Sequence, residues 1–160
     1  MMRRIAFLLA SLGVVGALGW SVVDAEALIR DGEIVLVEMA PVDPRSLMQG
    51  DYMRLAWAME RAVSIGEPGV HTVVIGVDDR RVATYRRRAD AAPLAADERR
   101  FEMRGGSRRS SGIEPHSFLF QEGRADDFAA AKFGIFRVAP SGRHLLVGLA
   151  RADGSPITPR

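Results

Sequence analysis

The first feature of the hydrophobic pattern is an apolar run over residues 5–23 that contains no charged side chain. A helix rises about 1.5 Å per residue, so this run nearly spans a hydrocarbon core of about 30 Å. Arg3 and Arg4 precede the run, whereas acidic residues follow it at Asp24, Glu26 and Asp31. By the positive-inside rule, this asymmetry predicts a single-pass protein of the inner (cytoplasmic) membrane, with the N-terminus in the cytoplasm and the remainder in the periplasm.

A cleaved signal peptide is the competing interpretation of the same segment. Residues 25–27 read Ala-Glu-Ala and fit the A-x-A cleavage pattern. However, the apolar run is longer than the usual h-region of about 7–15 residues, and the helical pattern continues to Gly32 without a breaker. We therefore expect residues 1–31 to form a retained signal-anchor and residues 32–160 an exported domain, with cleavage near Ala27 as the open alternative.

After Gly32 the pattern changes to short β-type runs separated by turn residues. The strands we expect cover residues 33–39, 52–59, 70–77, 81–86, 99–104, 117–120, 134–138 and 143–149. Turn residues at 78–80 and 140–142 predict two hairpins, and residues 125–133 predict one short helix. The fold class is therefore mainly β (α+β): a small barrel- or sandwich-like domain with one short helix, preceded by the transmembrane helix.

Alternation within the expected strands identifies core positions. Leu55 and Trp57 lie two residues apart on one face and should enter the same core. Phe101 and Met103 define the buried face of the 99–104 strand in the same way. The Gly/Ser/Arg-rich stretch over residues 105–111 predicts a mobile loop.

Composition removes several classes of chemistry. The chain has no cysteine, which excludes disulfides, thiolate metal sites and a cysteine nucleophile. His71, His116 and His144 have no metal-ligand spacing, so we expect no metal and no cofactor. The stretch Glu114-Pro115-His116 holds a carboxylate and an imidazole two residues apart, and is either one edge of a site or a solvated loop.

The charges are mixed along the chain. Its 22 basic and 20 acidic residues give a net charge of only +2 and are interspersed, which argues against nucleic-acid binding. One dense arginine set has two interpretations, a contact for anionic lipid or an acidic partner, or a solvated strand end: Arg80, Arg81, Arg86, Arg87 and Arg88.

The most distinctive candidate site lies between residues 41 and 55. Two prolines stop a strand, a tight loop follows, and the chain restarts at Gly50-Asp51. Arg45 is near enough in sequence to pair with Asp43 or Asp51. The cluster is either a turn locked by Asp and Arg or, together with Tyr52 and Glu122, a binding site.

A serine hydrolase is the enzymatic alternative at this loop. Ser46 precedes the Gly-Asp turn in a way that faintly resembles signal-peptidase-like serine–lysine proteases, but the spacing is too short. The only lysine, Lys132, falls in the expected helix. A serine without an activating base is a weak nucleophile, so we expect no catalytic residue here.

Residues 50–57 read Gly-Asp-Tyr-Met-Arg-Leu-Ala-Trp, and this motif resembles the GDYXXLXY family. Trp57 replaces the final tyrosine, which keeps a ring but loses the hydroxyl and so indicates packing instead of reaction. Residues 118–123, 131–138 and 145–149 also resemble the family. The resemblance implies a membrane-anchored protein, often associated with polytopic membrane proteins, and carries over no defined activity and no catalytic residue.

The function expected from the sequence is a periplasmic interaction module or accessory subunit of a polytopic membrane protein. The alternative is a small-ligand-binding or hydrolytic domain that uses the Asp43, Arg45 and Asp51 region with Glu122. Convergence of these side chains on an open pocket would favour the alternative, whereas side chains satisfied within a turn would favour the interaction module.

Overall fold

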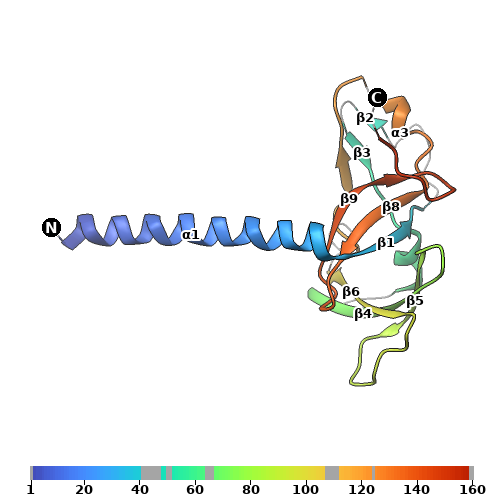
Figure 1. Ribbon diagram of the computed structural model, residues 1–160, viewed down its shortest axis with the longest axis horizontal. Coiled ribbons are helices and arrows are strands. Elements are labelled where there is room, and N and C mark those ends of the chain that lie inside the picture. Colours follow the sequence, from blue (N-terminus) through green and yellow to red (C-terminus); the bar gives the residue numbers. More distant parts are fainter. Residues whose placement is uncertain are drawn as a thin grey trace.

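The computed structural model describes residues 2–40, 48–49, 52–63, 67–106, 112–123 and 125–158, and consists of one long helix followed by a β domain (Figure 1). The helices are α1 (Met2–Asp31), the 3-10 helix η1 (Ala58–Ala62) and α3 (Ala125–Phe128). The strands are β1 (Glu33–Glu38), β2 (Met48–Gln49), β3 (Tyr52–Arg54), β4 (Gly69–Val77), β5 (Ala83–Arg88), β6 (Glu98–Gly105), β7 (Ser117–Leu119), β8 (Phe133–Val138) and β9 (His144–Ala150). The predicted mainly β fold behind an N-terminal helix is confirmed.

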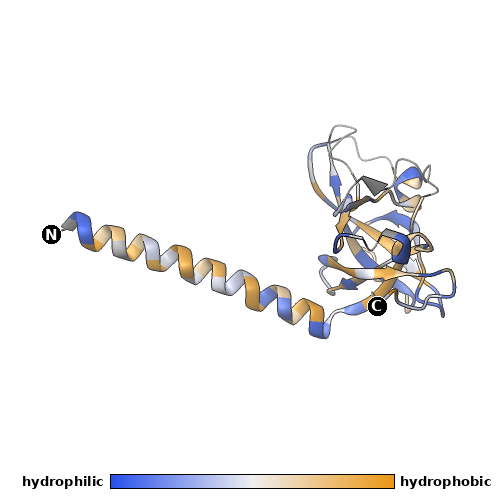
Figure 2. Cartoon of the chain, turned by 90° about the horizontal axis from the view of Figure 1, so that it is seen from above, coloured by the Kyte–Doolittle hydropathy of each residue, from blue (hydrophilic) through white to orange (hydrophobic). Residues whose placement is uncertain are grey.

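Helix α1 is apolar on all sides. Its section Arg3–Asp31 is long and apolar enough to cross a membrane. Figure 2 shows hydrophobic residues along the middle of α1 and hydrophilic residues at both of its ends. Large side chains such as Phe7 and Trp20 are 72% and 75% exposed. A helix that is hydrophobic all round is suited to apolar surroundings on every side.

The last two turns of α1 are attached to the domain. Leu28 is buried, and Gly32 N donates a hydrogen bond to its carbonyl oxygen at 2.9 Å. Arg137 Nη1 of β8 donates to the carbonyl oxygen of Gly32 at 2.8 Å. Asp24, one residue after the apolar run, forms an ion pair with Arg143 at the start of β9. The helix therefore contacts β8 and β9 and continues directly into β1.

Three small antiparallel sheets make up the domain, with strand orders β1-β8-β9, β2-β3-β7 and β5-β4-β6. The two predicted hairpins are present as the β4–β5 and β8–β9 pairs. Neighbouring strands are often distant in sequence, since β1 pairs with β8 through contacts such as Val35↔Phe136. Within the described residues the sheets do not close into a barrel.

The larger of two hydrophobic core clusters lies between the sheets. Trp57, Phe101 and Phe136 are its largest fully buried side chains, and the ring centroids of Trp57 and Phe136 are 5.1 Å apart in an edge-on contact. Trp57 Nε1 donates a buried hydrogen bond to the carbonyl oxygen of Ile113 at 2.9 Å. Leu55 belongs to the same core cluster, so the predicted shared core is confirmed.

Two elements are shorter than predicted by several residues. The strand expected over residues 52–59 ends at Arg54. After Leu55 the backbone leaves β7, because the carbonyl oxygen of Ala56 accepts from Ala40 N at 2.8 Å and Trp57 forms an isolated bridge with Met39, and the chain then turns into η1. The helix expected over residues 125–133 ends at Phe128, because Lys132 N bonds the carbonyl oxygen of Ala150 and Phe133 opens β8. Residues 107–111 of the expected loop lie outside the described residues.

Candidate functional site

The site predicted from the sequence is only partly described. Asp43, Arg45 and Asp51 lie outside the described residues. Tyr52 is half-buried in β3, where it pairs with Leu119 of β7. Glu122 is exposed just after β7 and has no hydrogen bond or ion pair to any described residue. The alternative of a binding site formed by these five residues therefore stays a hypothesis.

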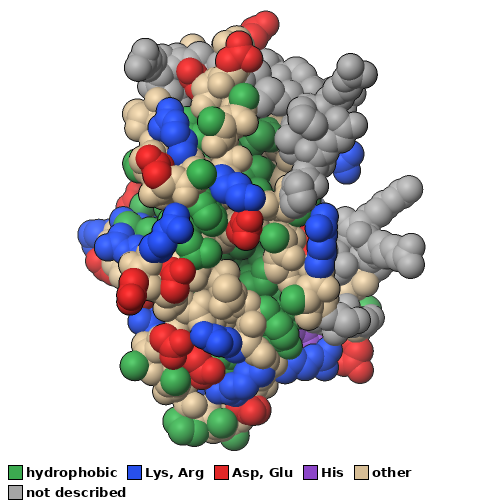
Figure 3. Space-filling view, turned by 90° about the vertical axis from the view of Figure 1, so that its right-hand side faces the viewer, with side chains coloured by type: hydrophobic (Ala, Val, Ile, Leu, Met, Phe, Trp, Pro, Cys, Tyr) green, Lys and Arg blue, Asp and Glu red, His purple; other side chains and the backbone are tan. Residues whose placement is uncertain are grey.

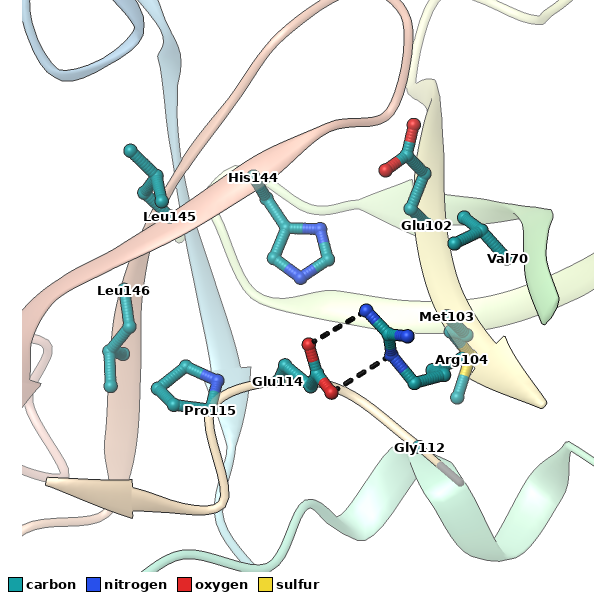
Figure 4. Close-up of a pocket in the computed structure, with 10 residues that line it drawn as sticks. All are labelled: Val70, Glu102, Met103, Arg104, Gly112, Glu114, Pro115, His144, Leu145 and Leu146. Atoms are coloured by element: carbon teal, nitrogen blue, oxygen red, sulfur yellow. Dashed lines mark hydrogen bonds and ion pairs between the residues drawn. The ribbon is translucent and has the colours of Figure 1, made fainter. Parts of the chain in front are cut away.

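A pocket of about 380 Å³ lies elsewhere, between β6 and β9 (Figure 4). These two strands belong to different sheets. They are connected at one end, where Glu102 N donates to the carbonyl oxygen of Gly142 at 2.9 Å. Gly142 has a φ of 102°, and a Cβ there would lie 3.1 Å from the β6 backbone, so glycine permits this close approach. Beyond the connection the strands separate, and Gly112, Glu114 and Pro115 line the opening.

An ion pair lies in this pocket. Arg104 Nε and Nη2 donate to the two carboxylate oxygens of Glu114 at 2.9 and 3.3 Å. Figure 4 shows the carboxylate of Glu114 pointing toward the guanidinium of Arg104, with the ring of His144 facing the same space from β9. Both members of the pair are about half-exposed, so the pair contributes little to stability but fixes a charged edge beside apolar walls.

His144 is the most perturbed group in the pocket. Its ring stacks on Phe101 with centroids 4.0 Å apart and an angle of 8° between the planes. Burial lowers the pKa of His144 below its usual 6.5, and interactions with the carbonyl of Gly142 and with Glu114 oppose this shift. Nδ1 donates to the carbonyl oxygen of Gly142 at 3.2 Å. The ring is therefore neutral at neutral pH and acts as a polar group in an otherwise apolar wall.

In the sequence, Glu114 stands beside His116, and the two were expected to form either one edge of a site or a solvated loop. His116 does not line the pocket, and its buried Nε2 has no hydrogen-bond partner among the described residues. The structure brings His144 to Glu114 from β9 instead, and Arg104 from β6. These three side chains come from separate parts of the chain, so no local spacing could have grouped them.

The described residues do not provide a metal site. No group of three or more His, Cys, Asp or Glu side chains able to hold a metal ion occurs among them. Lys132, the only lysine, pairs with Glu38 at 2.8 Å and does not lie in a helix. The charged and polar side chains that line the pocket are Glu102, Arg104, Glu114 and His144.

The dense arginine set is divided by its partners. Arg86 pairs with Asp97 at 3.4 Å, and Arg87 pairs with both Asp90 and Glu98. Arg80 Nη2 donates to the carbonyl oxygen of Ala152 at 3.1 Å. Arg81 has no hydrogen bond or ion pair from its side chain to any described residue. The set is therefore not one uniform basic patch.

The side of the domain opposite α1 mixes charges of both signs. Figure 3 shows Lys and Arg side chains interspersed with Asp and Glu around hydrophobic side chains on this face. Like charges do not gather there over a wide area. On this face, apolar side chains therefore lie beside charges of both signs, and no extended patch of one charge creates a strong electrostatic potential.

Comparison with known proteins identifies one family. A family model described as GDYXXLXY protein matches residues 14–149, which include the second half of α1 and all strands up to most of β9. No curated protein and no solved structure matches the chain.

Proposed function

This chain belongs to the GDYXXLXY protein family, and we propose that it is a membrane-anchored interaction module, an accessory subunit of a polytopic membrane protein on the periplasmic side of the membrane. The observation that carries this proposal is the joint between α1 and the β domain.

The joint fixes the domain close to the end of the apolar run. Residues 24–31 continue α1 by two turns, which at 1.5 Å per residue add about 12 Å. Over this short distance Leu28 is buried in the domain and Asp24 pairs with Arg143. A domain attached by a flexible linker would sample many orientations, whereas this one keeps a constant face toward the bilayer. A constant orientation favours a partner that is itself in the membrane.

The charges flanking the apolar run support the direction of insertion. Arg3 and Arg4 lie before it, and Asp24, Glu26 and Asp31 lie after it. The positive-inside rule then assigns residues 1–4 to the cytoplasm and the β domain to the periplasm. The helix passes through Ala27 without a break, and the cleavage site of the competing signal-peptide interpretation would lie inside it.

Small-ligand binding is the second candidate function, and the β6–β9 pocket is the observation that favours it. Its volume of about 380 Å³ falls within the range of small-molecule sites, roughly 300–1,000 Å³. Arg104, Glu114 and His144 supply the few polar groups that such a site needs. If this candidate is correct, replacing these three side chains should abolish binding of the small ligand and should not affect contact with a partner protein.

Photocrosslinking in living cells tests the leading proposal. A photoreactive residue at Ile29, which is exposed on α1 beside the domain, should crosslink to a protein with several membrane spans. The matched control is Ala130, which is exposed just after α3, and Figure 1 shows α3 away from the joint. Mass spectrometry of the purified adduct identifies the partner. Adducts of equal yield at both positions, or adducts only with soluble proteins, would contradict the proposal.

A further inference from the structure

A groove of about 490 Å³ runs over the outer face of the β1-β8-β9 sheet. Val35 and Val37 point inward and are fully buried, so alternation directs their neighbours on β1 outward. The floor of the groove is apolar and consists of Ile34, Ile135 and Val147, together with Leu36, which is itself buried against Phe133 and Ala150. Its two walls are the β4–β5 turn and the turn after β9.

Arg81 in the β4–β5 turn has an unusual backbone conformation. Its φ is 63°, and it is the only non-glycine residue with a positive φ among the described residues. The turn holds it there, because the carbonyl oxygen of Asp78 accepts from Arg81 N at 2.8 Å and Asp78 Oδ1 accepts from Val82 N at 2.8 Å. Hairpins of this kind usually carry glycine at the left-handed position. Arginine there costs conformational free energy, and such residues concentrate at functional sites.

The guanidinium of Arg81 has no partner within the described residues, whereas Arg80, Arg137 and Asp153 each have one. Arg80 donates to the carbonyl oxygen of Ala152, and Arg137 donates to the carbonyl oxygen of Gly32. Asp153 accepts from both N and Oγ of Ser155, at 2.9 and 2.7 Å. Asp79 is exposed at the rim, so three arginines and two aspartates leave an excess of one positive charge. A planar, unpaired donor beside an apolar floor matches a carboxylate attached to apolar side chains.

We propose that this groove docks an extended segment of the membrane partner, with an acidic side chain of the segment paired to Arg81 and its apolar side chains on Ile135 and Val147. This inference rests on the proposed function and adds the chemistry of the partner. The groove begins where α1 ends, since Ile34 follows Gly32 by two residues and Arg137 contacts Gly32. A segment that emerges from the same membrane therefore reaches it over a short distance.

Labelled peptides test the proposal on the full chain in detergent micelles. The probes are fluorescein-labelled hexapeptides that alternate valine or leucine with serine and carry a central glutamate, together with counterparts that carry glutamine or lysine. Fluorescence anisotropy measures their affinity. We expect the glutamate peptides to bind about tenfold more tightly than either counterpart, because a charge-assisted hydrogen bond to Arg81 is lost in both.

Two variants of Arg81 separate binding from folding. Arg81→Gly should reduce affinity for the glutamate peptide about tenfold while raising Tm, because glycine adopts the left-handed conformation without strain. Arg81→Gln should reduce affinity similarly without the gain in Tm. The matched control is Arg100→Gln, an exposed arginine of β6 outside the groove, which should bind as the wild type does.

Equal affinity for the glutamate and lysine peptides, no binding by any peptide, or full binding by Arg81→Gly would overturn the groove proposal. If the crosslink from Ile29 persists in any of these cases, the proposed function stands and only the groove is excluded. If the chain with the photoreactive residue at Ile29 and no other change gives no crosslink to a membrane protein, the proposed function itself is contradicted.

Discussion

Trp57 contributes to stability through both its ring and its N–H group. The ring is 1% exposed and contacts Phe136, and Nε1 donates to the carbonyl oxygen of Ile113. Trp57→Ala should lower the free energy of unfolding by about 3–5 kcal/mol, measured by urea denaturation. Trp57→Phe keeps a ring but leaves the buried carbonyl unpaired, so its loss should be smaller but measurable. A Trp57→Ala midpoint equal to that of the wild type would contradict this packing.

His144 should make stability depend on pH near neutrality. Burial lowers its pKa in the folded chain, so between the folded value and the unfolded value of 6.5 the unfolded chain binds more protons. The contribution of His144 to the free energy of unfolding is then complete above pH 6.5 and is lost as the pH decreases below 6.5. His144→Phe keeps the stack on Phe101 but cannot titrate. Its Tm should decrease less than that of the wild type between pH 7 and about pH 5.

Parallel Tm profiles for the two proteins would contradict the shift at His144. The carboxyl groups do not obscure the comparison, because the pKa values of Asp24 and Asp153 are lowered from 3.8 by Arg143 and Ser155 respectively. Their contributions are lost only at more acidic pH. The measurement therefore isolates one group.

Residue roles that depend on local chemistry could be predicted, and those that depend on distant contacts could not. Trp57 was expected to pack because it lacks the hydroxyl of the tyrosine in the motif, and it is buried. His144 and Arg104 meet Glu114 only because β6 and β9 approach each other. No pattern in sequence encodes that approach, since the strands belong to different sheets.

Among the elements, β8 requires a glycine against the core. A Cβ at Gly134 would lie 2.5 Å from Cη2 of Trp57 and 3.0 Å from Cδ1 of Leu146. Gly134→Ala should therefore lower the free energy of unfolding by about 1–3 kcal/mol, as overpacking of a dense core does. Gly148→Ala on the neighbouring strand β9 is the control, because its Cβ would meet only Ile135 Cδ1 at 3.8 Å. Equal losses in the two variants would exclude overpacking as the cause.

The joint between α1 and the domain depends on one side of the helix. Leu28 is 6% exposed, whereas its neighbour Ile29 is 46% exposed. Leu28→Ala should destabilise the domain by about 2–5 kcal/mol, and Ile29→Ala should change its melting little. Arg143→Gln removes only an exposed ion pair with Asp24 and should also leave the melting temperature close to that of the wild type. Identical melting of the Leu28 and Ile29 variants would mean that the helix end does not pack.

Hairpins were the elements most readily predicted, because turn residues and β-branched runs are local signals. The β4–β5 and β8–β9 hairpins formed where expected. The strand expected over residues 52–59 was too long, although its alternation was correct. Leu55 and Trp57 bury the predicted face, but after Leu55 the backbone pairs with the segment that follows β1, through the isolated bridge between Trp57 and Met39, and no regular strand forms there. Alternation of apolar and polar residues therefore predicts which side chains are buried, but it does not predict which backbone segments pair as strands.

For the whole molecule, composition and periodicity predicted the mainly β fold class but not how the strands pair into sheets. The mainly β class follows from short runs and turns, whereas the three sheets depend on which strands pair. Strand β1 pairs with β8 and not with β2, its neighbour in sequence. Such pairing is selected by burial of the shared core around Phe101 and Phe136. A single sequence contains the apolar residues of that core but not their partners.

The topology of the whole chain gives the last prediction. A reporter enzyme that is active only after export, fused after Arg160, should be active, because the charge asymmetry around residues 5–23 favours transfer of the C-terminal side. The protein should remain with the membrane after a carbonate wash, since α1 passes unbroken through Ala27 and its next residue, Leu28, is buried in the domain. The control removes the positive charges before the apolar run: the double substitution Arg3→Glu and Arg4→Glu should reduce reporter activity. Release into the soluble fraction with a new N-terminus near Ala27 would instead establish cleavage. An inactive reporter would indicate the opposite orientation, with the C-terminus in the cytoplasm.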